Sequence, residues 1–181
     1  MATKTNGNGM DAVTLLKADH RKVEELFAKF ESATRKEQKE KLAQQICMEL
    51  TIHTTIEEEI FYPACKEAVE DDLLDEAYVE HDGAKMLIAE ISQGSPDDPF
   101  YNAKVTVLSE EIKHHVKEEE KRAEGMFAQA KAAGLDMNEL GMRMAARKKD
   151  LMADIKANGL PAPETRTMKG ALVTYGEPLA G

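Results

Sequence analysis

At 181 residues the chain is the size of one domain with short appendages, and its abundance of Ala, Glu, Lys, Leu and Met favours helices over strands. The net charge of −10 leaves no basic excess to neutralise phosphates, which argues against a nucleic-acid partner. No apolar run reaches the roughly 18 residues that cross a bilayer, and the first residues lack the apolar segment of a signal peptide, so we expect a cytoplasmic protein without a membrane partner.

Five helices are predicted along the chain, because apolar residues recur every three or four positions in five stretches. Asp11 is the expected N-cap of the first helix, and Pro63 loosens or ends the second. Asp98 is the expected N-cap of the fourth helix, with Pro99 at its first position. Gly159 closes the fifth helix. The predicted ranges are about 11–32, 34–62, 71–92, 98–133 and 138–157.

The first four helices follow one another through short connections, which is typical of an antiparallel up-down-up-down four-helix bundle. We therefore predict an all-α fold with a bundle over residues 10–134, preceded by a disordered lead over residues 1–9. An accessory C-terminal helix within residues 135–159 has one apolar face, which suits either packing on the bundle or forming a homodimer. Residues 160–181 contain prolines and glycines without periodicity, so we expect an extended or mobile tail.

Four of the five histidines occupy corresponding places in the two halves of the predicted bundle. Each half has a lone histidine on its first helix and an HxxxE motif on its second helix. The second half repeats the three residues of the first half at offsets of 61, 62 and 62 residues. The repeated residues are His20, His53 and Glu57 in the first half, and His81, His115 and Glu119 in the second half.

The spacing of these residues has a physical reason. Residues four apart lie on one face of a helix, so each HxxxE motif offers an imidazole and a carboxylate to the same point in the core. Four imidazoles and two carboxylates exceed what a tetrahedral zinc ion needs, and they suit two metal ions bridged by the carboxylates. Glu57 lies between Ile56 and Ile60 on the buried face, and an unpaired buried carboxylate is so costly that we expect a cation beside it.

Two overlapping HxxxE frames begin at the adjacent residues His114 and His115. The frame of His115 and Glu119 has apolar Ile112 and Leu108 three and seven residues before the histidine, as in the first motif. The other frame would turn charged residues toward the core. We therefore predict that His115 faces the core and that His114 lies at the rim or in solvent.

Four stretches of the chain resemble the hemerythrin-like HHE cation-binding family: LLKADHRKVEELF, HTTIEEEIFYP, EHDGAKMLIAEI and HHVKEEE. The resemblance extends from residue 11 to about residue 133. It implies a four-helix bundle that holds two iron ions with an oxo or hydroxo bridge. It also implies that the six repeated residues are the ligands and that oxygen, peroxide or a similar small molecule is the partner.

The chain departs from the oxygen-carrying members of this family, which use five histidines and an HxxxxD motif on the last helix. The missing donor would be water, Glu24 or Tyr62, and the sequence leaves these alternatives open. An insertion around Arg122, after the second HxxxE motif, predicts a bulge or kink at Gly125.

Three functions are considered at this stage. The first is a centre that binds oxygen or a related molecule for storage, sensing or a stress response. The second is an enzyme that uses the same centre to decompose hydrogen peroxide or to oxidise a small substrate. The least favoured is an interaction protein that holds no metal and acts through its fifth helix and tail, because it would leave Glu57 and Glu119 buried without cations. Imidazole and carboxylate also suit zinc and manganese, so the prediction of iron rests on the resemblance.

Overall fold

Every regular element is helical in the computed structural model, which describes residues 10–170 and 176. The elements are α1 (Ala12–Ser32), α2 (Lys36–Ile56), the π-helical turn η1 (Glu57–Phe61), α3 (Tyr62–Cys65), α4 (Asp71–Gln93), α5 (Tyr101–Glu120), α6 (Met126–Ala132) and α7 (Met137–Asn158).

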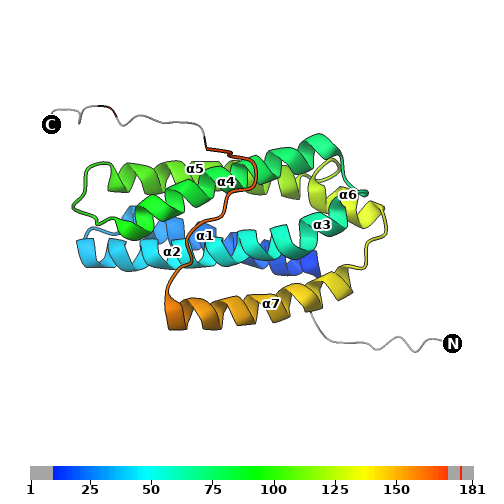
Figure 1. The fold of residues 1–181 in the computed structure, drawn as a ribbon, viewed down its shortest axis with the longest axis horizontal. Coiled ribbons are helices and arrows are strands. Elements are labelled where there is room, and N and C mark those ends of the chain that lie inside the picture. Colours follow the sequence, from blue (N-terminus) through cyan, green and yellow to red (C-terminus); the bar gives the residue numbers. More distant parts are fainter. Residues whose placement is uncertain (1–9, 171–175, 177–181) are drawn as a thin grey trace.

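Four antiparallel rods form the bundle (Figure 1). They are α1, then α2 continued by η1 and α3, then α4, and then α5 followed by α6. α1 packs on α2, α4 packs on α5, and α2 with α4 and α1 with α5 close the bundle. α7 lies along the outside, against α1 and α2. The predicted all-α bundle with an additional helix is therefore confirmed.

The capping signals read from the sequence are correct at two helix ends and wrong at a third. Asp11 accepts a hydrogen bond from the backbone N–H of Thr14 at 3.1 Å, and Gly159 follows α7 with a φ of 84°. Asp98 does not cap a helix. Its carboxylate instead accepts the N–H of Ser95 at 2.7 Å, because the connecting loop closes on itself ahead of α5. The N-cap of α5 is Phe100, which has a φ of 63°.

The core consists of two apolar clusters separated by a buried polar layer. Along α1, for example, Leu16 belongs to one cluster and Val23 to the other, and the buried Asp19 and His20 lie between them. The polar layer also contains buried residues from the other three rods. They are His53, Thr54, Glu57, Glu58, His81, Asp82, His115 and Glu119. A layer of this kind, inside a close-packed bundle, is the expected place for a functional site.

α7 uses its apolar face within the chain. Leu140, Gly141 and Met144 are buried there. A Cβ atom on Gly141 would lie 2.8 Å from the backbone nitrogen of Ala12, so the glycine allows α7 to approach the start of α1 closely. The sequence allowed either packing on the bundle or dimerisation, and the structure shows the packing.

The chain after α7 is extended, as predicted, but it is also held against the bundle. It crosses α2 and α4 (Figure 1). The carboxylate of Asp82, on α4, accepts the backbone N–H groups of Arg166 at 2.8 Å and Thr167 at 2.6 Å. The predicted disordered lead over residues 1–9 and most of the tail beyond Gly170 lie outside the described residues.

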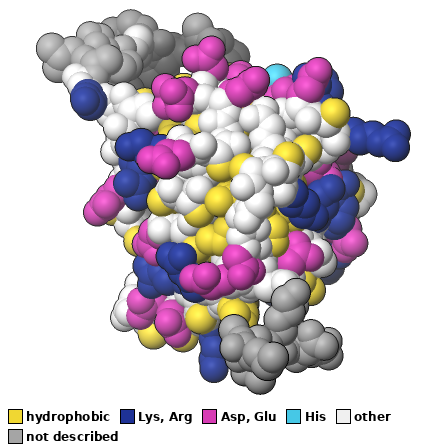
Figure 2. Space-filling view, turned by 90° about the vertical axis from the view of Figure 1, so that its right-hand side faces the viewer, with side chains coloured by type: hydrophobic (Ala, Val, Ile, Leu, Met, Phe, Trp, Pro, Cys, Tyr) yellow, Lys and Arg dark blue, Asp and Glu magenta, His cyan; other side chains and the backbone are white. Residues whose placement is uncertain are grey.

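The surface carries mixed charge. Figure 2 looks onto the end of the molecule nearest α6, where acidic and basic side chains alternate around exposed apolar ones. Neither sign of charge forms a continuous patch on this face. Between residues 10 and 170, no helix is both long enough and apolar enough to cross a bilayer.

Candidate metal centre

All six candidate ligands lie in the buried polar layer, and none of these residues is more than 4% exposed. Their donor atoms fall into two groups, and within each group the atoms lie within 4.8 Å of one another. Glu57 belongs to both. The His20 group consists of His20, His53, Glu57 and Glu119, and the His81 group consists of Glu57, His81 and His115.

The four candidate histidines form two pairs, and within each pair the two Nε2 atoms face each other. The Nε2 atoms of His20 and His53 are 3.2 Å apart, and those of His81 and His115 are 3.3 Å apart. Each pair joins a lone histidine to the histidine of an HxxxE motif. The pairing brings together residues from all four rods of the bundle at one level of the core.

The two carboxylates lie between the histidine pairs. Glu57 Oε2 is 3.1 Å from His53 Nε2 and 3.4 Å from His81 Nε2, so this oxygen touches both groups. Glu119 lies between the other two histidines, with oxygens 3.3 Å and 3.6 Å from their Nε2 atoms. The arrangement is that of two carboxylates shared between two sets of imidazoles.

Several buried carboxylate oxygens in this layer have no hydrogen-bond partner among the residues that the structure describes. They include both oxygens of Glu57 and one oxygen of Glu119. Burial, and then the charge of Glu119, raise the pKa of Glu57 well above its usual value. Burial lowers the pKa of His20, but its contacts with Glu119 and Glu120 outweigh burial and raise it to about 9. The layer therefore attracts positive charge, and its nitrogen and oxygen donors fit metal cations.

The two lone histidines each contact, through the ring nitrogen that faces away from the centre (Nδ1), the glutamate that directly follows an HxxxE motif. His20 Nδ1 lies 2.8 Å from Glu120 Oε1, and His81 Nδ1 lies 3.1 Å from Glu58 Oε1. A carboxylate that accepts the proton of Nδ1 orients the ring and leaves the lone pair of Nε2 free for a metal.

The histidines of the HxxxE motifs face the acidic residues that directly precede the lone histidines. His115 Nδ1 lies 2.7 Å from Glu80 Oε2. His53 Nδ1 and Asp19 Oδ2 face each other at 3.9 Å, beyond hydrogen-bond distance.

Our sequence reasoning missed all four of these acidic residues, although the signal was present. Asp19 and Glu80 repeat at an offset of 61 residues, and Glu58 and Glu120 at an offset of 62. The sequence repeat therefore includes these acidic residues as well as the six candidate ligands. In each half, an acidic residue precedes the lone histidine and a second glutamate follows the HxxxE motif.

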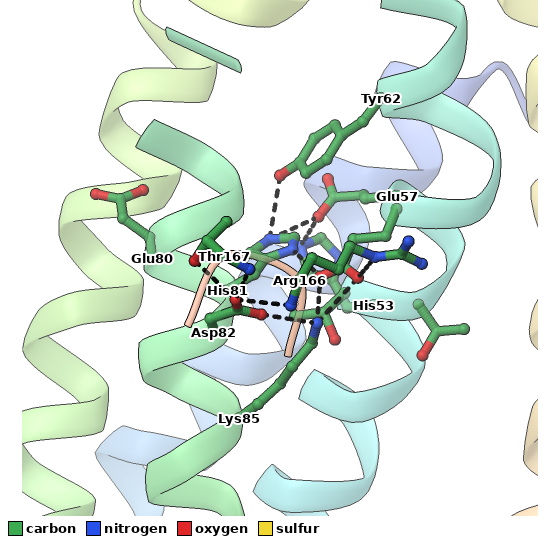
Figure 3. Close-up of polar contacts among 12 residues, drawn as sticks. His53, Glu57, Tyr62, Glu80, His81, Asp82, Lys85, Arg166 and Thr167 are labelled. Atoms are coloured by element: carbon green, nitrogen blue, oxygen red, sulfur yellow. Dashed lines mark hydrogen bonds and ion pairs between the residues drawn. The ribbon is translucent and has the colours of Figure 1, made fainter. Parts of the chain in front are cut away.

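Tyr62 reaches the centre, whereas Glu24 does not. The Tyr62 hydroxyl lies 3.1 Å from His81 Nε2 and donates a hydrogen bond to Glu119 Oε1 at 3.1 Å. Figure 3 shows this side chain above His81, beside Glu57. Glu24 instead forms an ion pair with Arg21 on α1, at 3.4 Å.

The π-helical turn explains why Tyr62 faces the centre. The N–H of Tyr62 donates to the carbonyl of Glu57, five residues earlier. In a regular α-helix a residue five positions on points about 140° away, whereas one additional residue in the turn reduces this angle to about 40°. The turn therefore places the hydroxyl on the same side as the Glu57 carboxylate.

The second HxxxE motif lies at the end of a helix. The predicted continuous helix to about Ala133 is wrong, because α5 ends at Glu120 and α6 begins at Met126. The expected disturbance at Gly125 takes the form of this break. A Cβ atom on Gly125 would lie 2.6 Å from the carbonyl oxygen of Glu119, so the returning chain needs a glycine there.

The structure distinguishes the two adjacent histidines on α5. His115 is buried at 2% exposure and belongs to the His81 group. The His114 side chain is 55% exposed and lies 3.4 Å from Glu80, away from the core. The apolar residues before His115 therefore identified the frame that faces the centre.

Comparisons with known proteins agree with this geometry. The family model of the hemerythrin HHE cation-binding domain matches residues 11–127. The crystal structure of a hemerythrin HHE cation-binding domain-containing protein from Mycobacterium kansasii has a TM-score of 0.68 and 24% identity. It covers 83% of this chain and 95% of its own, which shows a shared fold.

A curated relative is a DNA nickase from Nostoc sp. (strain PCC 7120), which is 29% identical over 111 residues. The match covers 61% of this chain but 32% of that protein, so the chain spans about a third of the length of this relative. The family match, in contrast, covers more than half of the chain and contains all six candidate ligands. The chain therefore belongs to the hemerythrin HHE cation-binding domain family.

Proposed function

We propose that this protein binds two iron ions in the buried polar layer and uses them to bind or react with oxygen or a related small molecule. The shared position of Glu57, with oxygens that have no hydrogen-bond partner, supports two ions rather than one. The nitrogen and oxygen donor set is compatible with iron, zinc and manganese. The family match specifies only a cation, so the proposal of iron rests on the resemblance to hemerythrin-like proteins. Bound iron would supply redox chemistry toward oxygen and peroxide.

The residues have distinct roles in this proposal. His20 and His53 would hold one ion, and His81 and His115 the other. The two carboxylates, Glu57 and Glu119, would bridge them. Tyr62 would be the additional donor of the His81 group, because its hydroxyl lies beside His81 Nε2.

A small cavity at the centre supports the proposal that the ligand is a small molecule. Its volume is about 10 Å³, and the four candidate histidines line it. Val23, Leu50 and Ile112 form its apolar walls. A space of this size holds about one water molecule, so it favours a very small ligand over a large substrate. The net charge of −10 also supports a small molecule rather than DNA as the partner.

Peroxide decomposition is a second candidate, in which the Tyr62 hydroxyl would keep its proton and act as a hydrogen-bond donor instead of as an iron ligand. This group donates a hydrogen bond to Glu119 Oε1 at 3.1 Å. Burial, and then the charges of Glu119 and Glu57, raise the pKa of Tyr62, so in the absence of a metal its oxygen holds a proton beside the donor atoms. A buried proton donor is useful when an oxygen–oxygen bond is broken, whereas storage or sensing needs only reversible binding.

Metal analysis of protein purified from iron-supplemented cells tests the centre, and we expect two irons per chain with near-ultraviolet oxo-to-iron absorption. One ion per chain, or none, would contradict it. Stopped-flow mixing of the diferrous protein with oxygen, beside an oxygen-evolution assay with peroxide, separates the two functions. A long-lived, reversible oxygen complex without peroxide consumption supports binding, and rapid oxidation with peroxide turnover supports the enzyme.

A further inference from the structure

The glutamate behind His81 is held by the C-terminal segment. Glu58 is 6% exposed, and its Oε1 lies 3.1 Å from His81 Nδ1. Its Oε2 accepts hydrogen bonds from the Arg166 guanidinium at 2.6 Å and from Lys85 at 2.9 Å (Figure 3). The carboxylate therefore contacts the His81 ring through one oxygen and the two cationic side chains through the other.

The backbone around Arg166 is held in place by hydrogen bonds to Asp82. Asp82 Oδ2 accepts the N–H groups of Arg166, Thr167 and Met168 at 2.8, 2.6 and 3.3 Å, and the Thr167 hydroxyl at 2.7 Å. Lys85 also donates to the carbonyl of Glu164 at 3.1 Å. Asp82 follows His81 directly on α4, so the chain around Arg166 is anchored one residue from the candidate ligand.

The other half of the centre obtains its cation from within the bundle. Glu120, behind His20, accepts a hydrogen bond from Arg21 at 2.7 Å, and Arg21 belongs to α1. The side chains of Arg21 and Arg166 are 55% and 54% exposed, so they are a matched pair. They differ in that Arg166 comes from a segment that the bundle does not need to complete its four rods.

We propose that Arg166 is a positioning residue of the metal centre, which acts through Glu58 to orient the His81 imidazole. The C-terminal segment thereby sets the affinity of the His81 group for its metal. The effect on affinity rests on the proposed two-ion centre, whereas the effect on the imidazole does not. A charge-assisted hydrogen bond holds a carboxylate in one place, and a fixed carboxylate holds the ring whose Nδ1 proton it accepts.

Cobalt titration of the metal-free full-length protein measures the affinity, because bound Co²⁺ has a visible spectrum. The step that His81→Ala removes identifies the His81 group. We expect Arg166→Ala to weaken this step on the order of tenfold, the lower end of the range for residues behind a metal ligand. Arg166→Lys should recover part of the loss. Arg21→Ala, the matched control, should weaken the other step instead.

A double-mutant cycle tests the route through Glu58. In the Glu58→Gln background, Arg166→Ala should have no further effect on the His81 step. Equal weakening of both steps, or an effect that persists in this background, would overturn the proposal. Circular dichroism of each metal-free variant checks that the helices are intact, and Arg166→Lys provides the test if Arg166→Ala fails to fold.

A measurement on the metal-free protein separates this inference from the proposed function. Nitrogen-15 NMR follows the exchange of the His81 Nδ1 proton, which should be faster in Arg166→Ala than in the wild type and unchanged in Arg21→Ala. Wild-type protein that takes up fewer than two cobalt ions would contradict the two-ion centre. The proton-exchange measurement would still test the positioning role of Arg166. Equal exchange rates in the wild type and Arg166→Ala would refute the positioning role.

Discussion

The His20 group and the His81 group have equivalent histidines but different surroundings. In the His81 group the Tyr62 ring lies 5.2 Å from the His81 ring and brings a hydroxyl to the donor atoms. In the His20 group the corresponding neighbour is Phe127, stacked on His20 at 5.9 Å, which has no polar atom. A repeat in sequence therefore supplies two similar sets of candidate ligands, and the helices around them make the two sets chemically unequal.

The helices that carry the two HxxxE motifs produce this difference. After Glu57 the chain continues through the π-helical turn directly into α3, so Tyr62 stays beside the centre. After Glu119 the helix ends within one residue, and the chain returns through Gly125 before Phe127 reaches His20. The comparison shows that the backbone after a ligand motif decides which further side chain joins the centre.

The largest effect is expected from Glu57→Gln, which removes the carboxylate that both groups share. The amide cannot bridge two cations, so we expect nearly complete loss of bound iron from both groups, measured by metal analysis. Glu59→Gln is the control, because Glu59 lies in the same turn but pairs with Arg147 at the surface, at 2.6 Å. Retention of one full iron in Glu57→Gln would show that the groups bind independently.

Tyr62→Phe tests the asymmetry directly. It removes the hydroxyl beside His81 Nε2 and the hydrogen bond to Glu119 Oε1, and it leaves His20 and His53 without any lost contact. We therefore expect the affinity for the ion of the His81 group to fall more, on the order of tenfold, than the affinity for the other ion. If the phenolate binds ferric iron, the wild type also has a visible charge-transfer band that disappears in the variant. Tyr78→Phe is the matched control, since Tyr78 packs on the Tyr62 ring at 5.2 Å. Equal weakening of both ions would argue against an unequal centre.

Gly125→Ala tests the helix break that distinguishes the second motif. The added Cβ would meet backbone atoms at 2.6 Å, so the return of the chain must shift, and we expect a loss of about 1–3 kcal/mol in the free energy of unfolding. Thermal and denaturant unfolding measure this change. Gly83→Ala is the control with the opposite sign: its Cβ has only Glu111 nearby, at 3.9 Å, and a helical alanine should stabilise by about 0.5–1 kcal/mol.

His114→Ala should have the smallest effect. The side chain is 55% exposed and lies outside both groups, so iron content should stay near the wild-type value and stability should change by less than about 0.5 kcal/mol. Metal analysis should compare the iron content of this variant with that of His115→Ala, which should lose iron from the His81 group. Equal iron loss in the two variants would contradict the placement of His115 as the ligand.

Local spacing in the sequence was enough to predict most of the helices and the six candidate ligands, although it missed the break between α5 and α6. Apolar residues at intervals of three and four predict a buried helix face, and residues four apart share that face. The choice of His115 over His114 needed only the apolar residues that precede each of them. The capping error at Asp98 was also local, since the carboxylate had a competing partner in its own loop.

The tertiary structure decided the features that depend on backbone geometry or on distant residues. Tyr62 reaches the centre because a π-helical turn changes its direction, and a pattern that assumes regular helix cannot show this. Arg166 lies 108 residues after Glu58, so no local spacing connects them. Residues that share a helix face can be recognised from periodicity, whereas contacts between distant segments are set by the free energy of the whole packed chain.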